Sequence, residues 1–235
     1  METDTLLQQK NFEQLADAKK YYRWVVDTFH TWIGQRVLEV GCGQGNVTTN
    51  LLDREFVLGI DFDETYLANI RKRFATHKNF SAENRDITRD VVTLKAQRFD
   101  TIVCMNVIEH IEDEVGAAKK MWDILEPGGQ IIMLAPAFQA LFSPYDHKVG
   151  HYRRYTKKTL RKTLESAGFS VPKTYYFNML GALGWFVVFK LLKRDFAGEG
   201  NVSLQEKLIP LLQTIERILP APFGLSVIAI GQKPL

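Results

Sequence analysis

Six short stretches of the chain are rich in the apolar and β-branched residues that favour strands, and a seventh, residues 79–85, is expected to be an irregular strand. In the stretches between them, apolar residues recur every three or four positions, as they do on one face of a helix. Strands that alternate with helices predict a parallel sheet with helices on both faces. The predicted strands are residues 37–40, 56–60, 79–85, 99–105, 130–135, 169–176 and 225–231.

The helical pattern begins near the N-terminus, where residues 5–33 are predicted to form a helical segment. A further helix ends at Pro127-Gly128-Gly129, which cannot continue it. Thr156 is a suitable N-cap for a later helix that Gly168 ends. The helices predicted after the N-terminal segment are residues 47–52, 63–74, 112–125, 157–167 and 204–219.

Three glycines at alternate positions, Gly41, Gly43 and Gly45, follow the first predicted strand. Because glycine permits a tight turn without a Cβ, we expect free backbone N–H groups there that a ligand can approach closely. The spacing differs from the Gly-x-Gly-x-x-Gly of the dinucleotide fingerprint. Asp61 ends the second strand about 20 residues after the first glycine, where a carboxylate is placed to accept hydrogen bonds from ribose hydroxyls.

Together with three later motifs, the glycine turn and Gly59-Ile60-Asp61 resemble the class I S-adenosylmethionine-dependent methyltransferases. The later motifs are Arg85-Asp86-Ile87, Asn106-Val107-Ile108-Glu109-His110 and Leu125-Glu126-Pro127-Gly128-Gly129. The resemblance implies an α/β, Rossmann-like fold: a seven-stranded, mostly parallel sheet with helices on both faces and the last strand antiparallel. It also implies a single methyltransferase domain over residues 1–235, with S-adenosyl-L-methionine as the cofactor.

The resemblance implies a set of cofactor-binding residues on these motifs. Asp86 is expected to contact the adenine amino group and Ile87 to pack against the ring. N-terminal segments of such enzymes often fold over the cofactor, where Tyr22 or Arg23 would meet its carboxylate; a helix packed on the edge of the sheet is the alternative. The implied residues are Tyr22, Arg23, Glu39, Gly41, Cys42, Gly43, Gly45, Asp61, Phe62, Asp86, Ile87, Asn106 and Val107.

The loop after the fifth predicted strand is dense in polar side chains. Loops at the carboxyl ends of strands form the ligand crevice of an open α/β sheet, so we expect the methyl acceptor to bind there. Its Gly-His-x-Arg-Arg-Tyr-Thr run resembles one branch of these methyltransferases, often associated with glycosyltransferase and lipid-linked sugar pathways, which implies a small-molecule or lipid-linked acceptor. The expected substrate-binding residues are Tyr145, Asp146, His151, Arg153, Arg154 and Tyr155.

Methyl transfer to a hydroxyl oxygen benefits from a general base with a pKa near neutrality, which favours histidine. His110, His147 and His151 are therefore the candidate catalytic residues, although His110 also suits the start of a helix. We expect no metal site, because the spacing of His147 and His151 is accompanied by no cysteine.

A basic run that begins at Arg153 and Arg154 continues into the predicted helix after Thr156. On a helix, such charges are usually a solvated face. The net charge of the chain is only +3, and no nucleic-acid partner is expected. We interpret Arg153 and Arg154 as a clamp for a carboxylate or phosphate on a small substrate.

A helical insertion at residues 177–223 is predicted between the sixth and seventh strands, far longer than an ordinary hairpin loop. Residues 179–189 form an apolar run that is too short to span a bilayer, which needs about 20 residues. We expect the insertion to form a mainly helical cap over the acceptor side of the crevice; the alternatives are ordinary cover of the sheet, a homodimer surface or a peripheral membrane contact.

Composition fits an ordinary globular protein, with 46% hydrophobic and 24% charged residues over 235 positions. Cys42 and Cys104 fall in the glycine turn and in a predicted buried strand, which does not suit a disulfide framework. The first residues lack the pattern of a signal peptide, so a cytoplasmic location is expected, with the possible membrane contact noted above.

Two other function classes remain open from the sequence. A nicotinamide-dependent dehydrogenase is disfavoured by the glycine spacing and by the motif that starts at Asn106. A non-catalytic cofactor-binding subunit that activates a partner would retain the same acidic residues.

Overall fold

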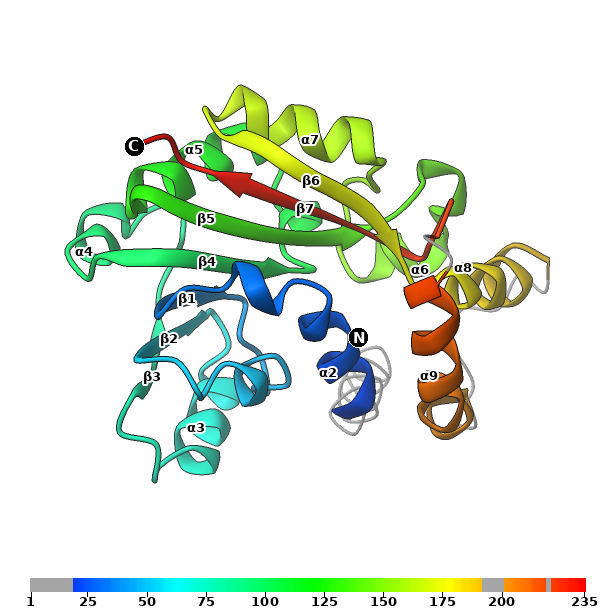
Figure 1. Cartoon of the computed structure of the whole chain (residues 1–235), viewed down its shortest axis with the longest axis horizontal. Helices are drawn as coiled ribbons and strands as arrows, with labels where there is room; N and C mark the ends of the chain where they lie inside the picture. Colours follow the sequence, from blue (N-terminus) through cyan, green and yellow to red (C-terminus); the bar gives the residue numbers. More distant parts are fainter. Residues whose placement is uncertain (1–18, 192–200, 219–220) are drawn as a thin grey trace.

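A seven-stranded sheet in the order β3-β2-β1-β4-β5-β7-β6 forms the centre of the protein in a computed structural model (Figure 1). The structure describes residues 19–191, 201–218 and 221–235. The strands are β1 Arg36–Val40, β2 Phe56–Asp61, β3 Phe80–Asn84, β4 Phe99–Met105, β5 Leu125–Pro136, β6 Ser170–Phe177 and β7 Ser226–Gln232.

The first five strands pair in parallel, whereas β7 lies between β5 and β6 and is antiparallel to both. The predicted seven-stranded sheet with an antiparallel last strand is therefore confirmed. Because β1, β2, β4 and β5 run in the same direction, the loops that follow them emerge at one edge of the sheet, where α/β folds bind ligands.

Helices cover both faces of the sheet, as predicted (Figure 1). On one face, Leu38, Val40 and Ile102 pack with apolar residues of α4, α5 and α7. On the other, Val37 and Val103 pack with residues of α2 and α9. The helices are α2 Lys19–Asp27, α3 Glu64–Arg73, α4 Val91–Lys95, α5 Glu114–Ile124, α6 Pro144–Lys148, α7 Lys157–Ser166, α8 Met179–Trp185 and α9 Asn201–Ile218.

The prediction of a helix at 47–52 is wrong, because the structure has only a 3₁₀ turn at Thr48–Asn50. The side chains of Thr49 and Asn50 hydrogen-bond back to the carbonyls of Gly45 and Asn46. Such bonds offer the backbone an alternative to a regular helix.

The insertion is helical in its described part, and the predicted helix at 204–219 appears as α9. Its two helices are joined by a carboxylate: Glu216 of α9 accepts hydrogen bonds from the backbone N–H groups of Asn178 and Met179, at the start of α8. Beyond α8, Phe186–Leu191 continues as a π-helix. Within the described ranges, every helix is too short or too polar to cross a membrane. Of the predicted N-terminal helical segment, residues 5–18 lie outside the described part. The α2 helix confirms it from Lys19 to Asp27, after which the structure has only a 3₁₀ turn at His30–Trp32.

Candidate active site

The glycine turn after β1 adopts a backbone conformation that side chains oppose. Gly41, Gly43 and Gly45 have φ values of 74°, 48° and 81°, all in the left-handed region. A Cβ at Gly41 would lie 2.4 Å from a methyl carbon of Val107, whereas a Cβ at Gly43 would meet no atom within 4 Å. The turn is therefore packed against the end of β4 at Gly41 and open at Gly43.

The backbone N–H groups of Gly41, Cys42, Gly43 and Gly45 are not free, contrary to the expectation from the sequence. Those of Gly41 and Cys42 both donate to the carbonyl of Ile60, and that of Gly45 donates to Cys42. The N–H of Gly43 donates to Asp61 Oδ2 over 2.8 Å. The turn is thus fastened to the end of β2, and a ligand there would meet side chains and the open face of Gly43.

Asp61 stands beside the turn at the end of β2, half-buried, and its Oδ1 accepts the N–H of Asp63. The next residue, Phe62, leaves 67% of its surface exposed. A carboxylate next to an exposed ring at the carboxyl edge of the sheet suits a ligand that has both hydroxyl groups and a flat aromatic part.

The two candidates on α2 point in different directions. Tyr22 is directed at the glycine turn, where its hydroxyl meets the side chain of Asn46, and burial raises the pKa of Tyr22. Arg23 is exposed, pairs with Asp27 and lines a surface hollow of about 460 Å³ with Thr49. The structure therefore brings Tyr22, but not Arg23, to the turn.

Glu39 of β1 is buried beneath the same turn. Its Oε2 accepts a hydrogen bond of 2.5 Å from the Thr48 hydroxyl. Burial raises the pKa of Glu39 to about 8. A carboxyl group so deep and so poorly paired is protonated at neutral pH.

The predicted adenine site is partly occupied by contacts within the chain. Asp86 accepts hydrogen bonds from the N–H and hydroxyl of Thr88 and pairs with Arg89 at 3.2 Å. Ile87 is 3% exposed and packs in the core. Asn106, at the end of β4, is exposed with a φ of 53°, beside Val107, which lies against Gly41.

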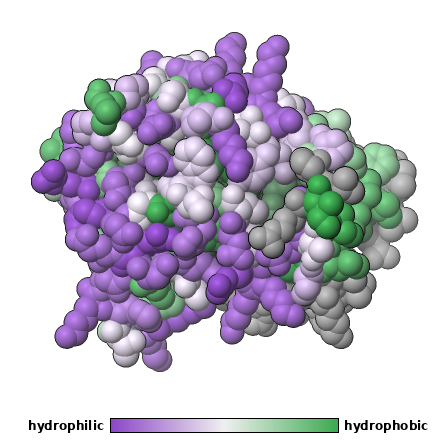
Figure 2. Space-filling view, viewed as in Figure 1, coloured by the Kyte–Doolittle hydropathy of each residue, from purple (hydrophilic) through white to green (hydrophobic). Residues whose placement is uncertain are grey.

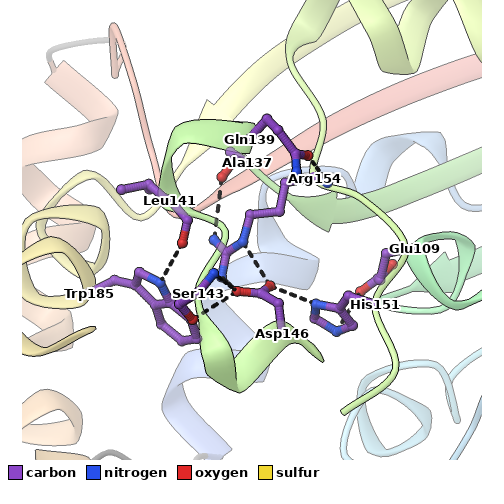
Figure 3. Close-up of polar contacts among 9 residues, drawn as sticks. All are labelled: Glu109, Ala137, Gln139, Leu141, Ser143, Asp146, His151, Arg154 and Trp185. Carbon is purple, nitrogen blue, oxygen red and sulfur yellow. Dashed lines mark hydrogen bonds and ion pairs between the residues drawn. The ribbon is translucent and has the colours of Figure 1, made fainter. Parts of the chain in front are cut away.

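The loop after β5 is organised around the buried carboxylate of Asp146 (Figure 3). It accepts bonds from the backbone N–H and hydroxyl of Ser143, from Nδ1 of His151 at 2.8 Å, and from Nε and Nη2 of Arg154. Although burial opposes ionisation, the bonds from His151 and Arg154 hold the pKa of Asp146 well below its usual range. Asp146 is therefore an anion that fixes one nitrogen of His151.

Trp185 of α8 covers this network. Its ring lies 4.6 Å from the guanidinium carbon of Arg154, and its indole N–H donates to the carbonyl of Leu141 (Figure 3). Tyr145 meets the same indole edge-on at 5.5 Å. The insertion is thereby attached to the candidate acceptor loop.

Two side chains, His110 and Glu109, lie on the other side of His151. The rings of His110 and His151 lie 4.6 Å apart, edge to face. Glu109 has no exposed surface, and its Oε1 is 3.9 Å from His151 Nε2. Burial raises the pKa of Glu109 to about 8, whereas partial burial and the neighbouring His151 lower the pKa of His110.

Other predicted residues of the loop do not join this group. His147 is exposed, and its ring meets that of Phe142 edge-to-face. Arg153 pairs with Glu114 and donates to a backbone carbonyl. The side chain of Arg154 is buried on Asp146, so neither arginine is open to clamp a substrate anion. Tyr155 is 1% exposed and belongs to the core.

Sequence reasoning missed Glu109 and Trp185 as parts of this site. Glu109 lies inside a motif that was noticed, but the pattern does not reveal that its carboxyl group is buried. Trp185 lies in an apolar run whose general role was left open.

Comparison with known proteins finds similarity to methyltransferases over part of the chain. Residues 37–129 match the Methyltransferase domain family. A probable S-adenosylmethionine-dependent methyltransferase of Mycolicibacterium smegmatis is 31% identical over 153 residues, which is 62% of this chain and 56% of that protein. A ubiquinone biosynthesis O-methyltransferase of Coxiella burnetii is 35% identical over 101 residues, or 42% of each chain. The chain thus spans about half the length of the curated relatives that it matches.

The fold is also that of methyltransferases. A crystal structure of an S-adenosylmethionine-dependent methyltransferase from Archaeoglobus fulgidus superposes with a TM-score of 0.62 at 18% identity, covering 92% of this chain and 94% of that one. The domain match and the relatives make this chain similar to S-adenosylmethionine-dependent methyltransferases, and the solved structure shows that it shares their fold.

Proposed function

We propose that the protein transfers a methyl group from S-adenosylmethionine to a hydroxyl oxygen of a small-molecule or lipid-linked acceptor. The observation that carries the proposal is the bond from His151 Nδ1 to Asp146, at the same edge of the sheet as the glycine turn. A histidine held in this way has its other nitrogen available to take a proton.

The residues around the glycine turn suit the cofactor. The open position at Gly43, the carboxylate of Asp61 and the exposed ring of Phe62 are the contacts that we assign to it, with Tyr22 closing the side toward α2. S-adenosylmethionine supplies a methyl group that its sulfonium already activates, so the protein mainly positions the acceptor and removes its proton.

Proton removal falls to His151 in this proposal. Its Nε2 accepts the proton of the acceptor hydroxyl as that oxygen forms its bond to the methyl carbon. Asp146 remains ionised, because its pKa is lowered, and stabilises the imidazolium that results. His110, whose ring touches His151, limits how the His151 ring can turn.

Apolar surface beside the loop supports a lipophilic acceptor. Four large apolar side chains of α8 and the π-helix are exposed, and Figure 2 shows apolar residues gathered on that side of the molecule. An exposed apolar patch of this kind marks a ligand, partner or membrane contact. The residues are Leu180, Leu183, Phe186 and Val187.

Calorimetric titration with S-adenosylmethionine, and separately with NAD, tests the cofactor. We expect binding of the first only. An acceptor screen with labelled methyl donor, which includes polyprenyl-linked and water-soluble hydroxyl compounds, then tests the reaction.

The role of His151 as general base is tested with two matched variants, assayed on the acceptor that the screen identifies. His151→Ala should lower methyl transfer by about 100-fold or more while cofactor affinity stays within a few-fold. His147→Ala, four residues away and outside the network, should behave like the parent. Equal activity of the two variants would remove His151 from the proposal.

A further inference from the structure

Glu109 presents a problem that the proposed reaction does not solve. The carboxyl group is completely buried, and neither oxygen has a hydrogen-bond partner. Buried polar oxygens normally have a hydrogen-bond donor or a metal ion beside them, and a metal ion would displace the proton that an unpaired buried carboxyl group keeps. Arg154, the buried cation in the neighbouring network, is committed to Asp146.

The carboxyl group of Glu109 lies close to two imidazoles. One ligand atom each from Glu109, His110 and His151 can be chosen so that all three lie within 4.8 Å of one another. Glu109 and His110 follow β4, and His151 comes from the loop after β5, so the group exists only because the loop folds over the end of β4.

Each imidazole also has a hydrogen bond that fixes its orientation. Nδ1 of His151 is bonded to Asp146, which leaves Nε2 directed toward Glu109. His110 is hydrogen-bonded to the backbone of Gly150. Histidine ligands of metal ions are typically oriented by a carboxylate or a backbone carbonyl in this manner.

We propose that Glu109, His110 and His151 bind one divalent first-row transition-metal cation. Two imidazoles and a carboxylate suit Zn²⁺, Co²⁺ or Mn²⁺, whereas Mg²⁺ prefers an all-oxygen shell. Three protein ligands leave at least one coordination position open. The pair of histidines that is close in sequence, His147 and His151, does not form this site. The structure pairs His151 with His110 instead.

The open position would face the methyl acceptor, and this consequence rests on the proposed function. A hydroxyl oxygen bound there releases its proton to solvent more readily, because the cation stabilises the resulting alkoxide. His151 is then a ligand, and its role as proton acceptor applies to the cation-free protein.

Metal binding is tested without turnover. The full chain is stripped with a chelator and titrated by calorimetry with Zn²⁺ and with Mg²⁺, and Co²⁺ binding is followed by its visible absorption. We expect one equivalent of Zn²⁺ or Co²⁺ to bind, and Mg²⁺ to bind at least about 100-fold more weakly.

Variants decide which residues hold the cation. Glu109→Gln and His110→Ala should each weaken Zn²⁺ binding by at least about tenfold, while His147→Ala should not. Circular dichroism checks that each variant is folded, and His110→Ala serves if Glu109→Gln is not. Absence of stoichiometric binding in the parent, or unchanged binding in the folded variants, would overturn the inference. If the protein transferred methyl groups but bound no cation, the metal site would be ruled out and the proposed function would stand. If it bound the cation but transferred no methyl group, the proposed function would fail and the metal site would stand.

Discussion

The glycine turn and the loop after β5 lie at the same edge of the sheet but are held in different ways. The turn is fixed mainly by backbone N–H groups that donate to Ile60, Cys42 and Asp61. The loop is fixed mainly by side chains that converge on Asp146. A turn made by the backbone depends on glycine at particular positions, whereas a loop made by side chains depends on one buried charge.

The buried carboxyl groups of the two regions show the same difference. Glu39, under the turn, is hydrogen-bonded by the side chain and backbone of Thr48 and has no charged donor, and burial raises its pKa to about 8. Asp146 is equally buried, yet its donors from Ser143, His151 and Arg154 keep it ionised. Asp146 has charged donors that offset the cost of its burial, whereas Glu39 has none, so Asp146 is an anion and Glu39 an acid.

The largest effect is expected from removal of the charge at the centre of the loop. Asp146→Ala leaves the buried guanidinium of Arg154 unpaired, so we expect the free energy of unfolding to fall by about 3–5 kcal/mol. Urea unfolding followed by circular dichroism measures it. Asp123→Ala, at an exposed position, is the control and should remain within about 0.5 kcal/mol of the parent. A similarly small change for Asp146→Ala would mean that the loop is not held by this carboxylate.

A pH-dependent effect is expected from Glu39. The unfolded chain ionises this residue above about pH 4.5, while the folded protein keeps it protonated up to about pH 8. Glu39 therefore makes the protein less stable as pH rises through this interval. Glu39→Gln should remove the loss, so its stability relative to the parent should rise by about 2–4 kcal/mol between pH 5 and pH 8.

Urea unfolding at the two pH values gives this difference. Glu55→Gln, at an exposed position just before β2, is the matched control, and its stability relative to the parent should not change with pH in the same way. If Glu39→Gln behaved like Glu55→Gln, the carboxyl group would not be protonated in the folded protein.

The role of the glycine turn in cofactor binding is tested at Gly43. Gly43→Val places a branched side chain at a φ of 48° in the open space assigned to the cofactor. We expect S-adenosylmethionine affinity to fall by at least about 100-fold, or about 2.7 kcal/mol. Gly184→Val is the control, since a Cβ there also meets no atom within 4 Å. Calorimetry should show normal binding by this variant; normal binding by Gly43→Val would displace the cofactor from the turn.

A smaller effect is expected where the insertion touches the loop. Trp185→Leu removes the ring over Arg154 and the indole hydrogen bond to Leu141, which together should contribute about 1–2 kcal/mol to stability. Methyl transfer should fall more than cofactor affinity, because the contact supports the acceptor loop. Leu183→Ala, at an exposed position of α8, should leave stability nearly unchanged. A fall in cofactor affinity alone would link the insertion to the turn instead.

The same contrast explains what the sequence could predict. The strands, the antiparallel β7 and the positions of Gly41 to Gly45 follow from local patterns and a known motif order, and the fold expectation is confirmed. The helix at 47–52 failed because Thr49 and Asn50 bond to the backbone, which hydrophobic periodicity does not register. The prediction of free backbone N–H groups at the turn was wrong, because their acceptors lie on β2 and within the turn itself.

The candidate acceptor site was harder to predict because its contacts are long-range. The indole bond from Trp185 to Leu141 spans 44 residues. His110 and His151 meet only when the loop folds over β4, whereas His147, so close to His151 in sequence, lies outside the group. Residue type placed these histidines among the candidates, but only the tertiary structure separates them.

The position of β7 has a consequence for how the protein is made. Because β7 fills the gap between β5 and β6, both strands keep an unpaired edge until residues 226–232 have left the ribosome. Pairing with β5 must then join segments about 90 residues apart, and contacts between such distant segments form slowly. Exposed strand edges promote association between chains. During synthesis, the half of the sheet that carries the acceptor loop is therefore the part most exposed to misassembly.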